Sequence, residues 1–403
     1  MFLFKLLFRP AAGAAVAILC VLAFFDPEVA RAQSFQTTAQ QAILVDADSG
    51  TVLFEKNADD LMAPASMAKT MTVEVIFHEI QEGRLSLDSE FTISENAWRK
   101  GGAASGGSAM FAQVHSTIKL SDLLRGIIVQ SGNDAAIAVA EGIAGTEENF
   151  ARMMTERARE LGMTRSTFRN ATGYGHPEQK VTARDLAKLA IHIIETYPDL
   201  YKIFGEREFT WNRIRQQNRN PLLAMDIGAD GLKTGNIDES GYGLTASAVQ
   251  NGQRLVLVVN GLKSARDRAN ESRKLLEWGF RAFEARQLFA AGETVGEAQV
   301  FGGDRRSLPL VSLRPVQVLL PRGSGDRIVA RIVYTGPLRA PIKAGDKVAH
   351  LQVARGDIQA LDIPLYAGED VAVGTLSQRA FDGLLEVGTG WIRRAFIAVT
   401  DRG

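Results

Sequence analysis

Three short elements of the chain combine a hydroxyl group with a lysine amine or an asparagine amide: Ser66-Met67-Ala68-Lys69, Ser131-Gly132-Asn133 and Lys233-Thr234-Gly235. A serine hydroxyl becomes an effective nucleophile when a neighbouring base takes its proton. Ser66 and Lys69 are three positions apart, so on a helix their side chains share one face and can meet. Lys69 must be neutral to act as that base, and burial or a nearby cation such as Lys233 would lower its pKa in that direction. The first element therefore predicts a serine nucleophile with a lysine base.

The second element interrupts a helical stretch predicted over residues 121–142. At such a break Ser131 and Asn133 can both point into a cleft, where we expect Ser131 to relay a proton to a leaving group and Asn133 to hold a substrate amide. Neither of the first two patterns is specific alone, because Ser116-Thr117-Ile118-Lys119 and Ser94-Glu95-Asn96 match them too. The three elements stand out by their order and context: a helix start, a helix break and a strand.

The third element lies on a predicted strand and is suited to binding a carboxylate. Lys233 and Thr234 offer an ammonium group and a hydroxyl, and Gly235 lets a substrate backbone lie against the strand edge. We expect the backbone N–H groups of Ser66 and Asn236 to form an oxyanion hole for the tetrahedral intermediate.

The elements that must position these residues begin with strands at 41–45 and 51–54, separated by a turn at 46–50. Helices are predicted over 66–82, 121–142 and 147–162, and a further helix opens at Thr182, where Asp185 gives a capping-box pattern. Strands at 231–234, 242–249 and 254–260 follow, the last two joined by Asn251-Gly252, and a helix spans 266–289. We therefore expect an α/β (α+β) domain in which the terminal parts of the chain share an antiparallel sheet.

The chain after about residue 292 has a different pattern, with short strands separated by turns of Pro, Gly and Asp. These strands are predicted at 316–320, 328–334, 348–353 and 359–366. They predict a small, separate all-β domain, a sandwich, behind the α/β domain.

Both ends of the chain carry membrane-related patterns. Lys5 and Arg9 precede an apolar run, and Ala30-Arg31-Ala32 gives a small-residue cleavage pattern, so residues 1–32 are predicted to be a secretory signal peptide. An uncleaved anchor is the alternative, although the apolar run is short for a spanning helix. Residues 376–403 combine aromatic and apolar side chains at helical spacing with arginines, which predicts an amphipathic helix on a membrane surface. The alternative is a helix that packs on its own domain.

Composition excludes several other classes of function. The 46 basic and 46 acidic residues balance, so no overall field attracts nucleic acid. The single cysteine, Cys20, falls in the predicted signal peptide, which excludes thiol catalysis and thiolate zinc sites from the mature chain. The five histidines show no zinc-ligand spacing, so we expect no cofactor and no metal.

With its three motifs, the chain resembles the low-molecular-mass penicillin-binding proteins of the serine-type D-alanyl-D-alanine carboxypeptidase family. Further segments carry this resemblance: Ala42-Ile43-Leu44-Val45-Asp46, Gly107-Ser108-Ala109-Met110-Phe111, Asp230-Gly231-Leu232, Gly241-Tyr242-Gly243-Leu244 and Arg268-Ala269-Asn270-Glu271-Ser272. The resemblance implies a catalytic domain of serine β-lactamase/transpeptidase type over residues 33–290, a β-sandwich domain over 291–375 and the anchoring helix over 376–403. It also implies that Arg268 helps to bind the terminal carboxylate of the substrate. One departure is Asn236, because well-known members have His after Lys-Thr-Gly.

The resemblance further implies removal of the terminal D-alanine from peptidoglycan stem pentapeptides through an acyl-serine intermediate. β-Lactams would acylate the same Ser66, and the protein would act at the periplasmic face of the bacterial inner membrane. A D,D-endopeptidase that cuts crosslinks would use the same residues, and a non-catalytic wall-binding scaffold is a further alternative. A class A β-lactamase would need a Glu-x-x-Leu-Asn segment between Ser131 and Lys233, and this chain has none.

Overall fold

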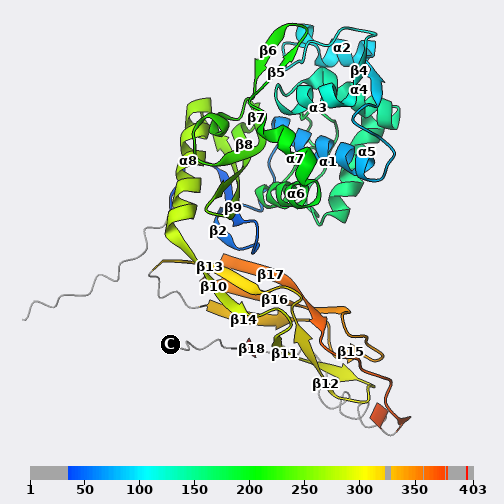
Figure 1. The fold of residues 1–403 in the computed structure, drawn as a ribbon, viewed down its shortest axis with the longest axis vertical. Helices are drawn as coiled ribbons and strands as arrows, with labels where there is room; N and C mark the ends of the chain where they lie inside the picture. Colours follow the sequence, from blue (N-terminus) through cyan, green and yellow to red (C-terminus); the bar gives the residue numbers. More distant parts are fainter. Residues whose placement is uncertain (1–34, 323–327, 357, 377, 380–395, 398–403) are drawn as a thin grey trace, which may run out of the picture. The chain divides into compact units, whose positions relative to one another are not determined.

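The computed structural model describes residues 35–322, 328–356, 358–376, 378–379 and 396–397. The strands at the two ends of the first domain form one five-stranded antiparallel sheet in the order β2-β1-β9-β8-β7 (Figure 1). Its members are β1 (Gln41–Asp46), β2 (Val52–Lys56), β7 (Ala229–Ile237), β8 (Gly241–Gln250) and β9 (Gln253–Leu262). The predicted hairpin turn joins β8 to β9, with positive φ at both Asn251 and Gly252. The expectation of a shared terminal sheet is confirmed.

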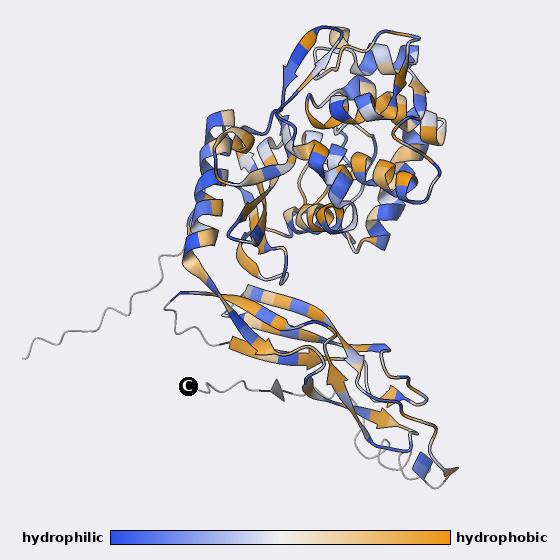
Figure 2. Ribbon diagram, viewed as in Figure 1, coloured by the Kyte–Doolittle hydropathy of each residue, from blue (hydrophilic) through white to orange (hydrophobic). Residues whose placement is uncertain are grey.

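Alternation along the strands gives the sheet two buried faces. Ile43, Val256 and Val258 belong to the core beneath the helical part of the domain, whereas Leu44 and Leu257 pack in a second core. The second core is covered by α8 (Ala265–Ala282), whose other faces are largely hydrophilic (Figure 2). The helical part consists of α1 (Lys69–Gln81), α2 (Glu95–Gly101), α3 (Leu120–Ile128), α4 (Asn133–Ala144), α5 (Glu147–Glu160), α6 (Ala183–Thr196) and α7 (Pro198–Tyr201). Two small two-stranded sheets accompany it: β3 (Glu90–Thr92) with β4 (Thr117–Lys119), and β5 (Glu208–Trp211) with β6 (Ile214–Gln217).

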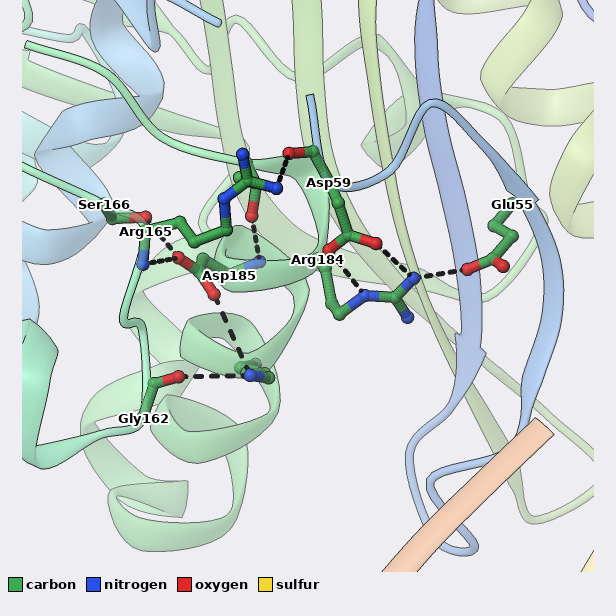
Figure 3. A network of polar contacts seen from close by, with 9 residues as sticks. Glu55, Asp59, Gly162, Arg165, Ser166, Arg184 and Asp185 are labelled. Atoms are coloured by element: carbon green, nitrogen blue, oxygen red, sulfur yellow. Dashed lines mark hydrogen bonds and ion pairs between the residues drawn. The ribbon is translucent and has the colours of Figure 1, made fainter. Parts of the chain in front are cut away.

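A polar network fixes α6 and the segment before it (Figure 3). Arg184 donates to Asp59, at 2.9 Å, and to Glu55 on β2, at 2.5 Å. Asp185 accepts from Ser166 Oγ at 2.7 Å, while Thr182 caps the helix by accepting from the Asp185 N–H. Since the Asp185 carboxylate accepts from Ser166, the network also anchors the segment that leads to residues 170–174.

The helix predicted over 266–289 is too long. It ends at Ala282, and β10 (Phe283–Phe289) pairs antiparallel with β13 (Val316–Pro321). The helical propensity of residues 283–289 is only a weak preference, and backbone pairing with β13 along the whole segment outweighs it. The sequence prediction also missed β11 (Thr294–Phe301), β12 (Ser307–Val311) and β15 (Leu338–Arg339). With β14 (Ile328–Val333), β16 (Lys347–Arg355), β17 (Ile358–Ala367) and β18 (Phe396–Ile397), they form a seven-stranded sheet in the order β15-β11-β12-β17-β16-β14-β18.

The predicted C-terminal amphipathic helix lies mostly outside the described residues. Two of its residues, Phe396–Ile397, form β18 against β14 instead of a helix. The backbone N–H and C=O groups on one side of β14 can pair with Phe396–Ile397 only if these two residues are extended. No helix within the described parts of the chain is long and apolar enough to cross a membrane.

Candidate active site

Ser66 lies in a tight turn at the base of the central helix. The turn is the 3-10 helix η1 (Ala65–Ala68), and α1 begins directly after it at Lys69. Ala65 has a positive φ of 48°, a conformation that is rare for residues with a side chain. The Lys69 Nζ lies 3.1 Å from Ser66 Oγ, so the predicted meeting of the two side chains occurs across the junction of η1 and α1.

Lys69 is fully buried and has three oxygen partners. Besides Ser66 Oγ, its amine donates to Asn133 Oδ1 at 2.7 Å and to the carbonyl of Thr172 at 2.5 Å. Burial lowers the pKa of Lys69 from 10.5 to about 7, because the ammonium form loses its hydration. At neutral pH about half of the Lys69 amines are therefore able to accept a proton.

Nearby charges adjust this pKa in both directions. After burial, the largest influence on Lys69 is the cation of Arg219, which lowers the pKa, while Asp134 and Glu147 raise it. Asp134 is buried at the start of α4 and accepts from the N–H groups of Met110 and Ala112. Its carboxylate thereby holds the segment after the glycine-rich loop against the site.

Ser131 and Asn133 lie at the break between α3 (Leu120–Ile128) and α4 (Asn133–Ala144). Ser131 has a φ of 65°, is 1% exposed, and its Oγ has no hydrogen-bond partner among the described residues. Strained, unpartnered polar groups of this kind occur preferentially at functional sites. Asn133 is the first residue of α4, and its Nδ2 donates to the hydroxyl of Tyr174 at 2.8 Å.

β7 carries the third element at the edge of the sheet, so one side of the strand has no strand partner among the described residues. Lys233 and Thr234 are buried, whereas Asn236 is exposed. A Cβ on Gly235 would lie 2.9 Å from Pro64 O and 3.1 Å from the Ala65 side chain. The missing side chain of Gly235 therefore lets β7 pack directly on the Ser66 turn.

The charges of several basic side chains act on this strand. Burial, followed by the charges of Lys69, Arg219 and Arg268, lowers the pKa of Lys233 well below 10.5. The Arg268 guanidinium lies 5.7 Å from the Tyr242 ring centroid, and its Nε has no partner in the described chain. No described carboxylate forms an ion pair with Arg219 or Arg268. Such a cluster favours an incoming anion.

Three contributors to the site, Arg219, Thr172 and Tyr174, were not predicted from the sequence. Thr172 acts through its backbone carbonyl, which carries no residue-type signal, and Tyr174 belongs to a loop whose sequence predicts only a turn.

The two look-alike motifs have structural roles. Ser94 is the N-cap of α2, accepting from the Ala97 N–H, and its hydroxyl donates to Glu141. Lys119 ends β4 and pairs with Asp88 at 2.9 Å. Among the described residues, no group of three or more His, Cys, Asp or Glu side chains could hold a metal ion.

A partly exposed serine hydroxyl beside a buried, readily neutralised amine, with a cation-lined strand edge next to it, defines a serine hydrolase site. Comparisons with known proteins specify the class. The family model described as D-alanyl-D-alanine carboxypeptidase matches residues 28–264, and the model of the penicillin-binding protein 5 C-terminal domain matches residues 283–373. The chain belongs to the D-alanyl-D-alanine carboxypeptidase family.

Individual relatives cover nearly the whole chain. It is 39% identical to the D-alanyl-D-alanine carboxypeptidase DacC of Escherichia coli, over 92% of this chain and 94% of the relative. It is 38% identical to DacA of Haemophilus influenzae, over 78% of this chain and 80% of that protein. Penicillin-binding protein 5 from Haemophilus influenzae has a similar structure, with a TM-score of 0.70, 35% identity and coverage of 84% and 98% of the two chains. The predicted family and fold class are confirmed.

Proposed function

We propose that this protein removes the terminal D-alanine from peptidoglycan stem pentapeptides, with Ser66 as the acylated nucleophile. The observation that carries the proposal is the 3.1 Å contact between Ser66 Oγ and the buried Lys69 amine, whose pKa is lowered to about 7. A lysine with an ordinary pKa of 10.5 would be neutral in only about one molecule in 3,000 at pH 7. The family relationship supports the substrate class.

In the acylation step Ser66 Oγ bonds to the carbonyl carbon of the penultimate D-alanine, and its proton passes to Lys69. The C–N bond then breaks, and the departing D-alanine amine takes a proton through Ser131, whose hydroxyl has no hydrogen-bond partner in the described part of the chain. Backbone N–H groups of Ser66 and Asn236 stabilise the oxyanion. In deacylation, water attacks the ester carbon, the shortened stem peptide leaves as an acid, and Ser66 recovers its proton.

Substrate binding follows from the edge strand and its cations. An extended stem peptide can pair with the edge of β7, since no strand of the described chain pairs with the backbone groups on that side. Lys233, Thr234 and Arg268 then bind the terminal carboxylate, aided by the charge of Arg219, and Asn133 holds the acyl-side amide. A bound carboxylate raises the pKa of Lys233 and favours its ammonium form.

The same residues explain inhibition by β-lactams, which mimic the D-alanyl-D-alanine end and acylate Ser66. The names of the penicillin-binding relatives support this part of the proposal. We place the enzyme on the periplasmic face of the inner membrane, exported by residues 1–32 and attached peripherally by the helix predicted over 376–403. The proposed domains are 33–290, 291–375 and this tail.

The test is intact-mass analysis of the chain from residue 33 after incubation with benzylpenicillin. Wild type should gain one penicillin mass, Ser66→Ala should gain none, and Ser116→Ala, which alters the look-alike motif, should behave as wild type. A folded wild-type protein that stays unmodified and leaves the penicillin intact would refute the acyl-serine mechanism, whereas rapid loss of penicillin without a lasting adduct would indicate a β-lactamase. Release of D-alanine from a stem pentapeptide, compared with cleavage of a crosslinked dimer, separates the carboxypeptidase from a D,D-endopeptidase.

A further inference from the structure

The side-chain amide of Asn133 is held at both ends. Its Oδ1 accepts from Lys69 Nζ at 2.7 Å, and its Nδ2 donates to Tyr174 OH at 2.8 Å. The Tyr174 hydroxyl donates its own proton to the carbonyl of Lys100, also at 2.8 Å. That carbonyl belongs to the last turn of α2, where helix carbonyls lack partners within the helix. The bonds therefore run in one direction, from Lys69 through Asn133 and Tyr174 to α2.

We propose that Tyr174 is a positioning residue that fixes the orientation of the Asn133 amide during catalysis. This inference rests on the function proposed above. Because the Tyr174 hydroxyl is committed to Lys100 as a donor, it can only accept from Asn133, which assigns Nδ2 to the Tyr174 side. One Nδ2 hydrogen points to Tyr174, and the second is left for the substrate carbonyl.

Gly107 supplies the space for this arrangement. A Cβ at position 107 would lie 2.9 Å from both Asn133 Nδ2 and Tyr174 OH, so it would wedge between the two partners of the hydrogen bond. Neighbouring Gly175, in contrast, has open space where a Cβ would be added and no positive φ. The absence of a side chain at Gly107 therefore leaves room for the hydrogen bond between Asn133 and Tyr174. Gly175→Ala, beside Tyr174, serves as a control substitution. The Tyr174 ring is 37% exposed, so loss of its hydroxyl leaves no unfilled core.

The fixed amide orientation affects the base as well as the substrate. Asn133 Oδ1 stabilises the ammonium form of Lys69, and a hydrogen bond to the charged form of a base raises its pKa. Without Tyr174 OH the amide can turn its Nδ2 toward Lys69, and the ammonium loses an acceptor. The pKa of Lys69 then falls, while the N–H directed at the substrate is lost.

The test is the pH dependence of the acylation rate with a fluorescent penicillin, measured for wild type, Tyr174→Phe, Gly107→Ala, the double variant and Gly175→Ala. Tyr174→Phe should lower the plateau rate at high pH about fivefold to tenfold, the loss expected for one hydrogen bond. It should also shift the acid limb of the pH–rate profile to lower pH than in wild type. Gly107→Ala should do the same, and the double variant should lose less than the product of the two single losses. Gly175→Ala should match wild type.

If wild type is acylated and Tyr174→Phe has the same pH–rate profile, the positioning role is overturned and the proposed function stays intact. A lower plateau with an unmoved acid limb would also overturn it, since that is the result of a merely structural defect. Failure of wild type itself to be acylated would overturn the proposed function and this inference together. Thermal unfolding of each variant shows whether a lost rate reflects a lost fold.

Discussion

Replacing Glu147 by Gln should make acylation faster at acidic pH, which is unusual for a substitution near a catalytic centre. Glu147 is on the first turn of α5, and its carboxylate is among the charges that raise the pKa of Lys69. Gln keeps the oxygen that accepts from the Ala171 N–H at 3.1 Å, so the change removes the charge and preserves the contact. The pKa of Lys69 should therefore fall below about 7.

The size of the effect follows from the path between the two groups. Glu147 bonds to Ala171, and the carbonyl of the next residue, Thr172, bonds to Lys69, so the two charges are within roughly 12 Å of each other. At an effective dielectric constant of about 20, Coulomb's law gives about 1.4 kcal/mol, or about one pKa unit, before screening. A fall of half a unit to one unit raises the neutral fraction of Lys69 at pH 6 about threefold to fivefold. At pH 9 the lysine is neutral in both proteins, and the rates should agree.

The assay is the second-order rate of acylation by a fluorescent penicillin between pH 5.5 and 9.5, at constant ionic strength. Glu148→Gln is the matched control, because this adjacent acid is exposed and is not among the groups that influence Lys69. A Glu147→Gln profile that is lower at every pH, or whose acid limb moves upward, would contradict the assignment of Lys69 as the base and of its charged neighbours.

Substitutions at three further positions test the geometry. Gly173→Ala places a Cβ 1.8 Å from Ala65 O in a residue with a φ of 84°. The substitution should therefore lower the free energy of unfolding by more than about 3 kcal/mol and abolish acylation. A melting temperature within a few degrees of wild type would contradict this prediction. Ser131→Gly should be about 1 kcal/mol more stable than Ser131→Ala in chemical denaturation, because glycine adopts a φ of 65° without strain. Both variants should release D-alanine slowly. Equal stabilities of the two variants would contradict the inferred backbone strain at position 131. Ser94→Ala should lose about 1 kcal/mol through its helix cap and leave acylation unchanged, and slower acylation would mean that this motif contributes to the site.

Features determined by neighbours in the sequence were predictable. The i, i+3 relation brings Ser66 and Lys69 together, and Asn251-Gly252 specifies the turn between β8 and β9. The hydrogen-bond partners of Lys69 were harder to predict. Asn133 was expected near the site without a defined contact, and Thr172 accepts through its backbone carbonyl from 103 positions away. The error at 283–289 has the same origin, because only pairing with distant β13 makes that segment a strand.

The place of β1 between β2 and β9 in its sheet has a consequence for how the enzyme is made. β1 pairs with β9, and its Gln41 contacts Asn260, 219 positions later in the chain. The first strand to emerge from the ribosome must therefore wait until most of the domain has been synthesised before its inner edge is paired. Closing so long a loop slows folding and leaves an unpaired strand edge exposed meanwhile. Ser66, which lies next to β7 from the same late segment, consequently acquires its surroundings only near the end of synthesis of the domain.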